Sequence, residues 1–319
     1  MGLGRMNAVI GENGSGKTFL LKALYAAVRA LEEAGRGHDP RSLETVLFDK
    51  LYWTFQVEKI GELVQKGADG PLHFTMEMSR GRFTYSFGKD TSRAISNLQS
   101  TVPQRTANSV FLPAKEVLSL LDVILKSREV DRVFGFDDTY LDLARALQIN
   151  RQKGRNYEEF AQSRERLEAI IGGRAEYDER AKRWMFRKGR AWFGIEVTAE
   201  GIKKIAILDM LLGNRYLTPD SIIFIDEPEA ALHPSAIVQF LDILATLSGR
   251  GIQIFIATHS YFVLKKLYLI AQQHEQSIPL AAHDGEGWHL ADLRDGLPEN
   301  AIVAESVRLY EQEVELALR

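Results

Sequence analysis

The sequence feature that most constrains the fold is the run Gly11–Thr18, which reads GENGSGKT. It directly follows the apolar segment 6–10 and leads into residues 16–34, where apolar side chains recur at helical spacing. A strand, a GxxxxGK[ST] pattern and a helix in this order form a phosphate-binding loop, because glycines let backbone amides converge on phosphate oxygens at the helix N-terminus. The chain is therefore expected to build an α/β fold around a site for a nucleoside triphosphate.

We predict that most residues of this loop contact the bound nucleotide. Those expected to contact it are Asn13, Gly14, Ser15, Gly16, Lys17 and Thr18. The Lys17 ammonium is placed to meet the β- and γ-phosphates, and the Thr18 hydroxyl is a type of ligand that Mg²⁺ accepts. The expected cofactors are a nucleoside triphosphate and Mg²⁺.

Two later strands end in residues that complete such a site. The apolar strand 221–226 ends in Asp226 and is followed by Glu227, and the strand 252–257 is followed shortly by His259. Active-site residues of parallel sheets gather at the carboxyl ends of the strands. Asp226 can hold Mg²⁺, Glu227 can orient and deprotonate a water, and the His259 imidazole can sense a γ-phosphate. We predict Glu227 and His259 as catalytic residues and Asp226 and Thr18 as metal ligands.

Composition excludes several other classes of protein. The chain has 319 residues, no cysteine and a formal net charge of −3. Without cysteine there is no disulfide framework or thiolate zinc site, which fits a reducing cytoplasm. We find no apolar run of about 18 residues and expect neither a membrane span nor a membrane partner. The net charge argues against a globally basic nucleic-acid binder, although a local basic patch stays open.

The order of expected elements is typical of a mostly parallel sheet flanked by helices, with antiparallel β-hairpins and an inserted helical lobe. Expected helices cover 16–34, 41–52, 58–66, 200–213, 234–248, 260–273 and 301–318, and expected strands cover 6–10, 72–78, 82–87, 183–187, 191–197, 221–226 and 252–257. We predict a single domain over 1–319. Its parts are a nucleotide-binding core over 1–112 and 184–300, a helical lobe over 113–183 and a C-terminal helix over 301–319.

The hairpin expected over 183–197 has two interpretations. Basic residues alternate there with aromatic ones, which is typical of a surface that binds nucleic acid; they are Arg180, Lys182, Arg183, Arg187, Lys188 and Arg190 with Trp184, Phe186, Trp192 and Phe193. Alternation also describes an ordinary hairpin with a buried aromatic face and a charged outer face. We favour the ordinary hairpin because alternation alone explains the pattern.

Taken together, these motifs resemble the ABC-type ATPases of the structural-maintenance, double-strand-break-repair and overcoming-lysogenisation-defect group. GENGSGKT is similar to their Walker A motif, IIFIDEPEAALHP (222–234) to their Walker B motif with its D-loop, and ATHS (257–260) to their switch-histidine loop. Small bacterial proteins known as AAA-family ATPases, some from anti-phage defence loci, resemble the chain most, including its segment FLPAKE (111–116). The resemblance implies a P-loop fold that binds ATP and Mg²⁺ in the cytoplasm.

The resemblance also implies a signature loop that completes the site of a partner subunit. The best match is 198–204, where Gly201 would offer its amide to a γ-phosphate across a homodimer, together with the D-loop around Ala231. Ala199 stands where the family has a serine, which makes slow hydrolysis an expectation. Thr198 as a plain helix N-cap is the alternative.

Two other family features have no clear counterpart. The best candidate for the glutamine loop is Gln56 by its position. The family's antiparallel strands before the Walker A strand are not seen, so no residue that contacts adenine can be named. Either the recorded start is internal or this part is reduced to the two hairpins.

The leading hypothesis is an ATP-hydrolysing switch in which two subunits sandwich two ATP molecules and control a separate effector, such as a nuclease or toxin. Anti-phage defence and DNA repair are expectations from the resemblance alone. The alternative is a scaffold or DNA-binding protein that holds ATP and hydrolyses it slowly or not at all. A small-molecule kinase, a GTPase and a transporter ATPase are weaker readings.

Overall fold

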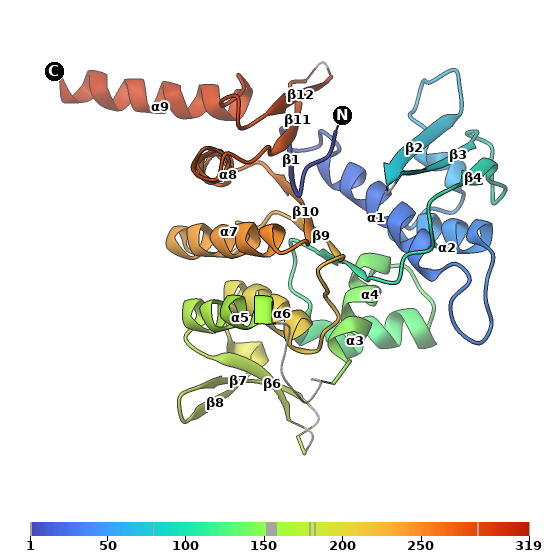
Figure 1. The fold of residues 1–319 in the computed structure, drawn as a ribbon, viewed down its shortest axis with the longest axis horizontal. Coiled ribbons are helices and arrows are strands. Elements are labelled where there is room, and N and C mark those ends of the chain that lie inside the picture. The colour runs from blue at the N-terminus through green and yellow to red at the C-terminus, as the bar shows by residue number, and fades with distance from the viewer. Residues whose placement is uncertain are drawn as a thin grey trace.

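The computed structural model describes residues 2–78, 80–150, 158–178, 180–181, 183–285 and 287–318. At its centre lies a six-stranded sheet with the order β12-β11-β1-β10-β9-β5 (Figure 1). The strands are β1 (Met6–Ile10), β5 (Ser109–Leu112), β9 (Ile222–Asp226), β10 (Gln253–Thr258), β11 (Pro279–His283) and β12 (Trp288–Asp292). All pair in parallel except β11 with β12. The predicted fold class, a mostly parallel sheet flanked by helices, is confirmed.

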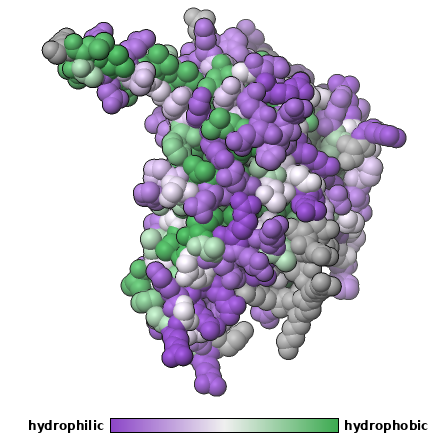
Figure 2. Space-filling model, turned by 60° about the vertical axis from the view of Figure 1, so that its left-hand side comes forward, coloured by the Kyte–Doolittle hydropathy of each residue, from purple (hydrophilic) through white to green (hydrophobic). Residues whose placement is uncertain are grey.

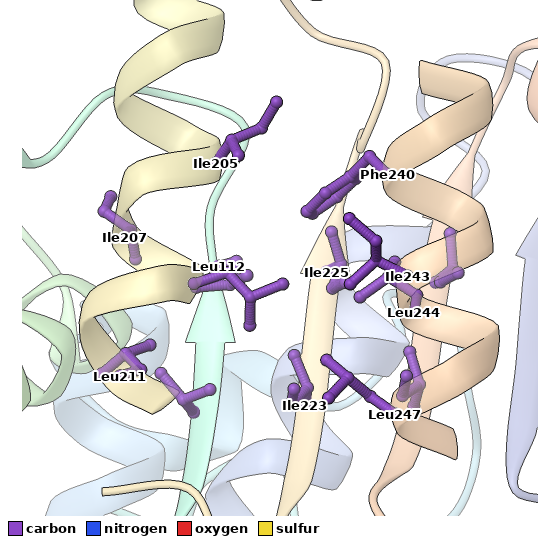
Figure 3. Packing of buried hydrophobic residues seen from close by; sticks show 14 of the residues in the cluster. Leu112, Ile205, Ile207, Leu211, Ile223, Ile225, Phe240, Ile243, Leu244 and Leu247 are labelled. Atoms are coloured by element: carbon purple, nitrogen blue, oxygen red, sulfur yellow. The ribbon is translucent and has the colours of Figure 1, made fainter. Parts of the chain in front are cut away.

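Helices cover both faces of this sheet, which explains why most residues of its central strands are apolar. On one face lie α1 (Lys17–Glu33) and α2 (Leu43–Phe55), packed with strand residues such as Phe111, Phe224 and Phe255. On the other lie α6 (Glu200–Gly213), α7 (Pro234–Gly249) and α8 (Tyr261–Gln273). Figure 3 shows Ile223 and Ile225 of β9 facing α7, with Leu112 of β5 facing α6. Alternate residues of each strand thus belong to two separate cores.

The sheet register brings the ends of the motif-bearing strands together. Ile10 pairs with Thr258, Ala257 pairs with Asp226, and Leu112 pairs with Ile225. The segments that follow β1, β10, β9 and β5 therefore leave the sheet at one edge. This edge holds the Walker A loop, the carboxylates after β9 and the histidine after β10.

A three-stranded antiparallel sheet follows α2. It contains β2 (Leu72–Met78), β3 (Gly81–Phe87) and β4 (Ser96–Ser100), and the third strand was not predicted. The helix expected over 58–66 is wrong: only a short 3₁₀ turn, η1 (Ile60–Leu63), forms there. Gly61 packs so closely on the backbone of Lys89 that a Cβ would lie 2.2 Å from its carbonyl oxygen. The contact between Gly61 and the distant Lys89 backbone, rather than the helical periodicity, therefore decides the structure of this segment.

The expected second hairpin is also part of a three-stranded sheet. It comprises β6 (Arg174–Asp178), β7 (Arg183–Lys188) and β8 (Ala191–Gly194), and the turn η4 (Ile195–Val197) replaces the last residues of the predicted strand. Phe186 is buried, but Trp192 and Phe193 are 48% and 45% exposed, so the prediction of a buried aromatic face is wrong for β8. β8 is the edge strand, and the core beneath the sheet does not reach it. Lys182 lies outside the described residues.

Short helices fill most of the stretch between β5 and β6. They are η2 (Leu118–Leu120), α3 (Leu121–Leu125), the π-helical turn η3 (Lys126–Val130), α4 (Asp138–Leu147) and α5 (Glu158–Ile171). Polar contacts join α4 to the Walker A helix: Lys22 pairs with Asp137 at 2.6 Å, and the Tyr25 hydroxyl donates to Asp142 at 2.9 Å. Burial opposes the charge of Asp142, but Lys50 and Arg29 together hold its pKa below the usual range.

The last helix, α9 (Ala301–Ala317), extends away from the body of the protein (Figure 1). None of its residues is buried, and hydrophobic side chains are visible along it in Figure 2. Within the described part of the chain, no helix combines the length and apolar character needed to cross a membrane.

Candidate functional site

At two positions of the Walker A loop, the backbone has a conformation that only glycine adopts without strain. Gly14 and Gly16 have φ angles of +83° and +90°, and Gly16 stands directly before the first residue of α1. The Lys17 ammonium group donates hydrogen bonds to the carbonyl oxygens of Gly11 at 2.8 Å and Glu12 at 2.7 Å. Burial lowers the pKa of Lys17, although nearby carboxylates oppose that shift. The loop thus curls around a positive charge.

Thr18 and Asp226 meet although they lie far apart in the sequence. The Thr18 hydroxyl donates to both oxygens of the Asp226 carboxylate, at 3.1 and 2.9 Å. Burial raises the pKa of Asp226. A hydroxyl beside a carboxylate suits Mg²⁺, which takes few protein ligands and completes its shell with phosphate and water. The described residues hold no cluster of three or more His, Cys, Asp or Glu side chains that would form a cage for a metal without a nucleotide.

The donors of the loop also fit a bound phosphate chain. The Ser15 hydroxyl is buried and has no hydrogen-bond partner among the residues that the structure describes, and Lys17 uses backbone carbonyls as its acceptors. A buried polar atom without a partner is uncommon in proteins and calls for an explanation. A phosphate oxygen would supply an acceptor for both side chains. The residues present therefore match the predicted nucleotide and Mg²⁺.

Glu227 and His259 lie together beside this pair. The His259 Nδ1 atom is 3.1 Å from Glu227 Oε1, and both side chains remain partly exposed. The Glu227 backbone has a φ of 47°, which is rare for a residue other than glycine. The residue before His259, Thr258, donates a hydrogen bond from its hydroxyl to Glu229 Oε1 at 2.7 Å. The structure thus brings together Lys17, Thr18, Asp226, Glu227 and His259.

Gly201 lies at the start of α6 and packs against the D-loop. A Cβ on Gly201 would be 2.5 Å from the carbonyl oxygen of Ala231, whose own φ is +60°. The N-cap residue of α6 is Ala199, without a side-chain cap, so the alternative in which Thr198 caps the helix is wrong. The Thr198 hydroxyl instead donates to the Gly194 carbonyl at 3.3 Å. Within one chain, the backbone of the signature-like turn at Gly201 therefore packs directly against the D-loop backbone at Ala231.

We expect Gly201→Ala to push these two segments apart. The added methyl group collides with backbone, which cannot rotate away as a side chain can, and overpacking of this kind costs about 1–3 kcal/mol of folding free energy. The variant should melt at a lower temperature in a thermal unfolding experiment. Gly249→Ala is the matched control, because Gly249 also lies on a helix and its Cβ would meet nothing within 4 Å. Equal melting temperatures for the two variants would contradict the contact.

Gln56 does not follow a strand at the sheet edge. It is the C-cap residue of α2, with a φ of 53°, and its Oε1 accepts a hydrogen bond from the Gly135 amide at 3.3 Å. The segment that follows Leu112, unlike Gln56, does leave the sheet beside the end of β9, because Leu112 pairs with Ile225. That segment, α6 and the D-loop line a cavity of about 230 Å³.

Sequence reasoning assigned no role to Lys204, although it lies within the quoted run 198–204. Its buried ammonium group donates to the carbonyl oxygens of Asp226 and Glu227. Burial lowers its pKa to about 8, while the nearby carboxylates Glu229, Asp226 and Glu227 oppose the shift. The sequence does show a lysine within an apolar stretch of a helix, which indicates a buried ammonium group. It does not show which carbonyl groups that ammonium group contacts.

Comparison with known proteins gives one short and several long similarities. A segment of 45 residues is 53% identical to part of the Old nuclease of Escherichia phage P2, covering 14% of this chain and 8% of that protein. The crystal structure of an SMC head bound to the C-terminal winged-helix domain of ScpA matches with a TM-score of 0.51 and 13% identity, over 92% of this chain and 91% of that one. The SMC head domain from Thermotoga maritima matches with a TM-score of 0.44 and 14% identity, over 92% of both chains.

The first of the two structural matches shows a shared fold, that of the ABC-type P-loop ATPase heads. The short similarity to the Old nuclease agrees with the predicted resemblance to the overcoming-lysogenisation-defect group. The family described as "AAA domain, putative AbiEii toxin, Type IV TA system" matches residues 6–265, which include the Walker A loop, both carboxylates and the histidine. The chain is therefore a member of this AAA-domain family and has an ABC-type P-loop ATPase fold.

Proposed function

We propose that the protein hydrolyses ATP in the presence of Mg²⁺. The observation that carries this proposal is the meeting of the Thr18 hydroxyl with the Asp226 carboxylate, directly beside the Glu227–His259 pair. A phosphate-binding loop alone supports nucleotide binding. A metal-ligating pair next to a carboxylate and an imidazole adds the groups that hydrolysis needs.

Each side chain has a distinct role in this proposal. Lys17 stabilises negative charge on the β- and γ-phosphates, and Thr18 and Asp226 hold Mg²⁺, which would supply further positive charge there. Glu227 orients a water and accepts its proton, and it retains enough exposure for a water to reach it. His259, 3.1 Å from Glu227, is close enough to register whether a γ-phosphate is present. Gln56 stays a weaker candidate for a nucleotide contact.

We further propose that two subunits sandwich two ATP molecules. Gly201 and the segment around Ala231 would then face the nucleotide of the partner subunit. In support of this, the first backbone hydrogen bonds of α6 are donated by the Ile202 and Lys203 amides to the Ala199 carbonyl. The amides that precede Ile202 at the helix N-terminus can therefore donate to an anion. Ala199 and Glu200 are exposed at that end. ATP binding would favour the closed pair, and hydrolysis would release it.

A separate effector protein in the cytoplasm is the proposed reader of this switch. The family description names a toxin of a toxin–antitoxin system, and the short similarity is to a nuclease. With these names in support, the proposed effector is a nuclease or toxin, and the proposed setting is defence against phage or DNA repair. The same relationships leave nucleic acid as a further partner.

A slowly or non-hydrolysing scaffold that binds DNA is the second candidate. Two observations favour it: Ala199 supplies no hydroxyl at the signature position, and β8 exposes Trp192 and Phe193. The Arg187 guanidinium lies 5.6 Å from the centre of the Trp192 ring, so a cation and an aromatic face are presented together. Such pairs stack on the bases of single strands.

One comparison separates the two candidates. The purified protein is incubated with ATP with and without Mg²⁺, and phosphate release and molar mass in solution are measured. We expect Mg²⁺-dependent release of phosphate and a rise in mass from one subunit to two when ATP is added. Binding of single-stranded DNA without any phosphate release would favour the scaffold.

A further inference from the structure

Lys204 connects the N-terminal part of α6 to the backbone of the proposed catalytic residue. Its Nζ donates hydrogen bonds to the carbonyl oxygens of Glu227 at 2.5 Å and Asp226 at 3.4 Å. The lysine is 8% exposed, so its side chain runs through the protein interior to reach them. A buried ammonium group is costly unless it is well hydrogen-bonded. This arrangement therefore indicates a role that an apolar residue would not fill.

The Glu227 backbone has a conformation that needs support. Its φ of 47° lies in the left-handed region, which is strained for a residue other than glycine. Its amide donates to the Ala257 carbonyl at 2.9 Å, and its carbonyl accepts from Lys204. β10 thus holds one side of this peptide backbone and α6 holds the other. The position of the Glu227 carboxylate beside His259 depends on both.

The same part of α6 also constrains the residues that follow Glu227. Gly201, one turn before Lys204, packs on the Ala231 carbonyl. Between these two contacts, the cavity of about 230 Å³ is lined in part by Lys204, Ala230 and Ala231. The turn over 226–231 is therefore attached to α6 at two places and has free space between them. A shift of the helix start would move the turn.

We propose that Lys204 is a positioning residue that holds Glu227 in its reactive backbone conformation and transmits movement of the α6 N-terminus to it. The inference rests on the proposed function. In a two-subunit sandwich, the start of α6 contacts the nucleotide of the partner subunit, whereas Glu227 acts on the nucleotide of its own subunit. Lys204 thereby makes hydrolysis at one site depend on occupancy of the other.

The test compares Lys204→Met, Lys204→Arg and the control Lys266→Met. Lys266 lies on α8 outside the site, and its ammonium group pairs with Asp242 at 2.6 Å. We expect Lys204→Met to lower kcat for ATP about 10-fold or more, with KM and the Kd for ATP within about threefold of the unmodified protein. Lys204→Arg keeps a donor and should recover part of the loss. Lys266→Met should keep kcat within about threefold.

A second measurement does not depend on turnover. Hydrogen exchange followed by mass spectrometry should show faster exchange of the peptide that contains 226–231 in Lys204→Met, but not in Lys266→Met. Unchanged kcat and unchanged exchange in Lys204→Met would overturn the inference. If the unmodified protein releases no phosphate, the proposed function fails, and the exchange data still decide whether Lys204 supports the turn. Should Lys204→Met not fold, Lys204→Gln, with a shorter donor, is expected to lose kcat in the same way, and a normal kcat would overturn the proposal.

Discussion

Replacement of Glu227 by glutamine is expected to lower ATP turnover by about 100-fold or more while ATP binding is retained. The amide keeps the size of the carboxylate but cannot accept a proton from water. Phosphate release measured at saturating ATP should report the loss. Because hydrolysis is what separates the two subunits in the proposed cycle, Glu227→Gln should also hold its ATP and remain a dimer in light scattering, where the unmodified protein returns to single subunits.

The control for this variant is Glu58→Gln, which makes the same chemical change at an exposed carboxylate outside the site. It should turn over ATP at the normal rate. Normal turnover by Glu227→Gln would mean that another group activates water and that the proposed role of Glu227 is wrong. A variant that loses turnover without forming an ATP-bound dimer would retain the proposed role of Glu227 but contradict the sandwich.

Replacement of Lys17 by methionine is expected to weaken ATP binding by about 100-fold or more, since charged hydrogen bonds to phosphate are worth several kcal/mol together. Methionine is similar in length but leaves the phosphates without the ammonium charge. It also removes the hydrogen bonds that the ammonium group donates to the Gly11 and Glu12 carbonyls. Titration of the protein with a fluorescent ATP analogue measures the affinity, and thermal unfolding shows whether the variant is folded.

Lys22→Met is the matched control, because Lys22 lies just over one turn further along α1 and pairs with Asp137. Its loss should leave the affinity for ATP within about threefold. If Lys17→Met, folded, bound ATP as well as the unmodified protein, the loop over 11–18 would not be the phosphate site. Equal losses in both variants would indicate a general effect of charge on α1.

The elements that carry the site were predictable because their signals are local. β1 and β9 are mostly apolar and each ends at a motif, and α1 begins at Lys17 because Gly16 supplies the left-handed backbone before it. Helices α6, α7 and α8 were predicted to within two residues at either end. Strand–helix alternation then implied a parallel sheet, and in such a sheet strand ends meet at one edge.

Other segments could not be predicted, because distant contacts decide their structure. The stretch 58–66 has helical periodicity but yields only η1, since Gly61 packs on the Lys89 backbone. Strands β4, β5 and β6 were missed because each depends on a neighbouring strand that it pairs with. Gln56 was chosen by its position in the chain, yet it caps a helix, whereas the segment after β5 reaches the sheet edge.

The sequence by itself determined that this chain has a phosphate-binding loop, two acidic residues at a strand end and a histidine after the next strand, because each motif is built from consecutive residues. Only the tertiary structure decided how they meet. The pairing of β1 with β10 and of β10 with β9 brings Thr18 to Asp226 and His259 to Glu227. The tertiary structure also showed that Gly201 and Lys204 attach α6 to the turn after β9, since the local sequence does not indicate which distant backbone a residue contacts.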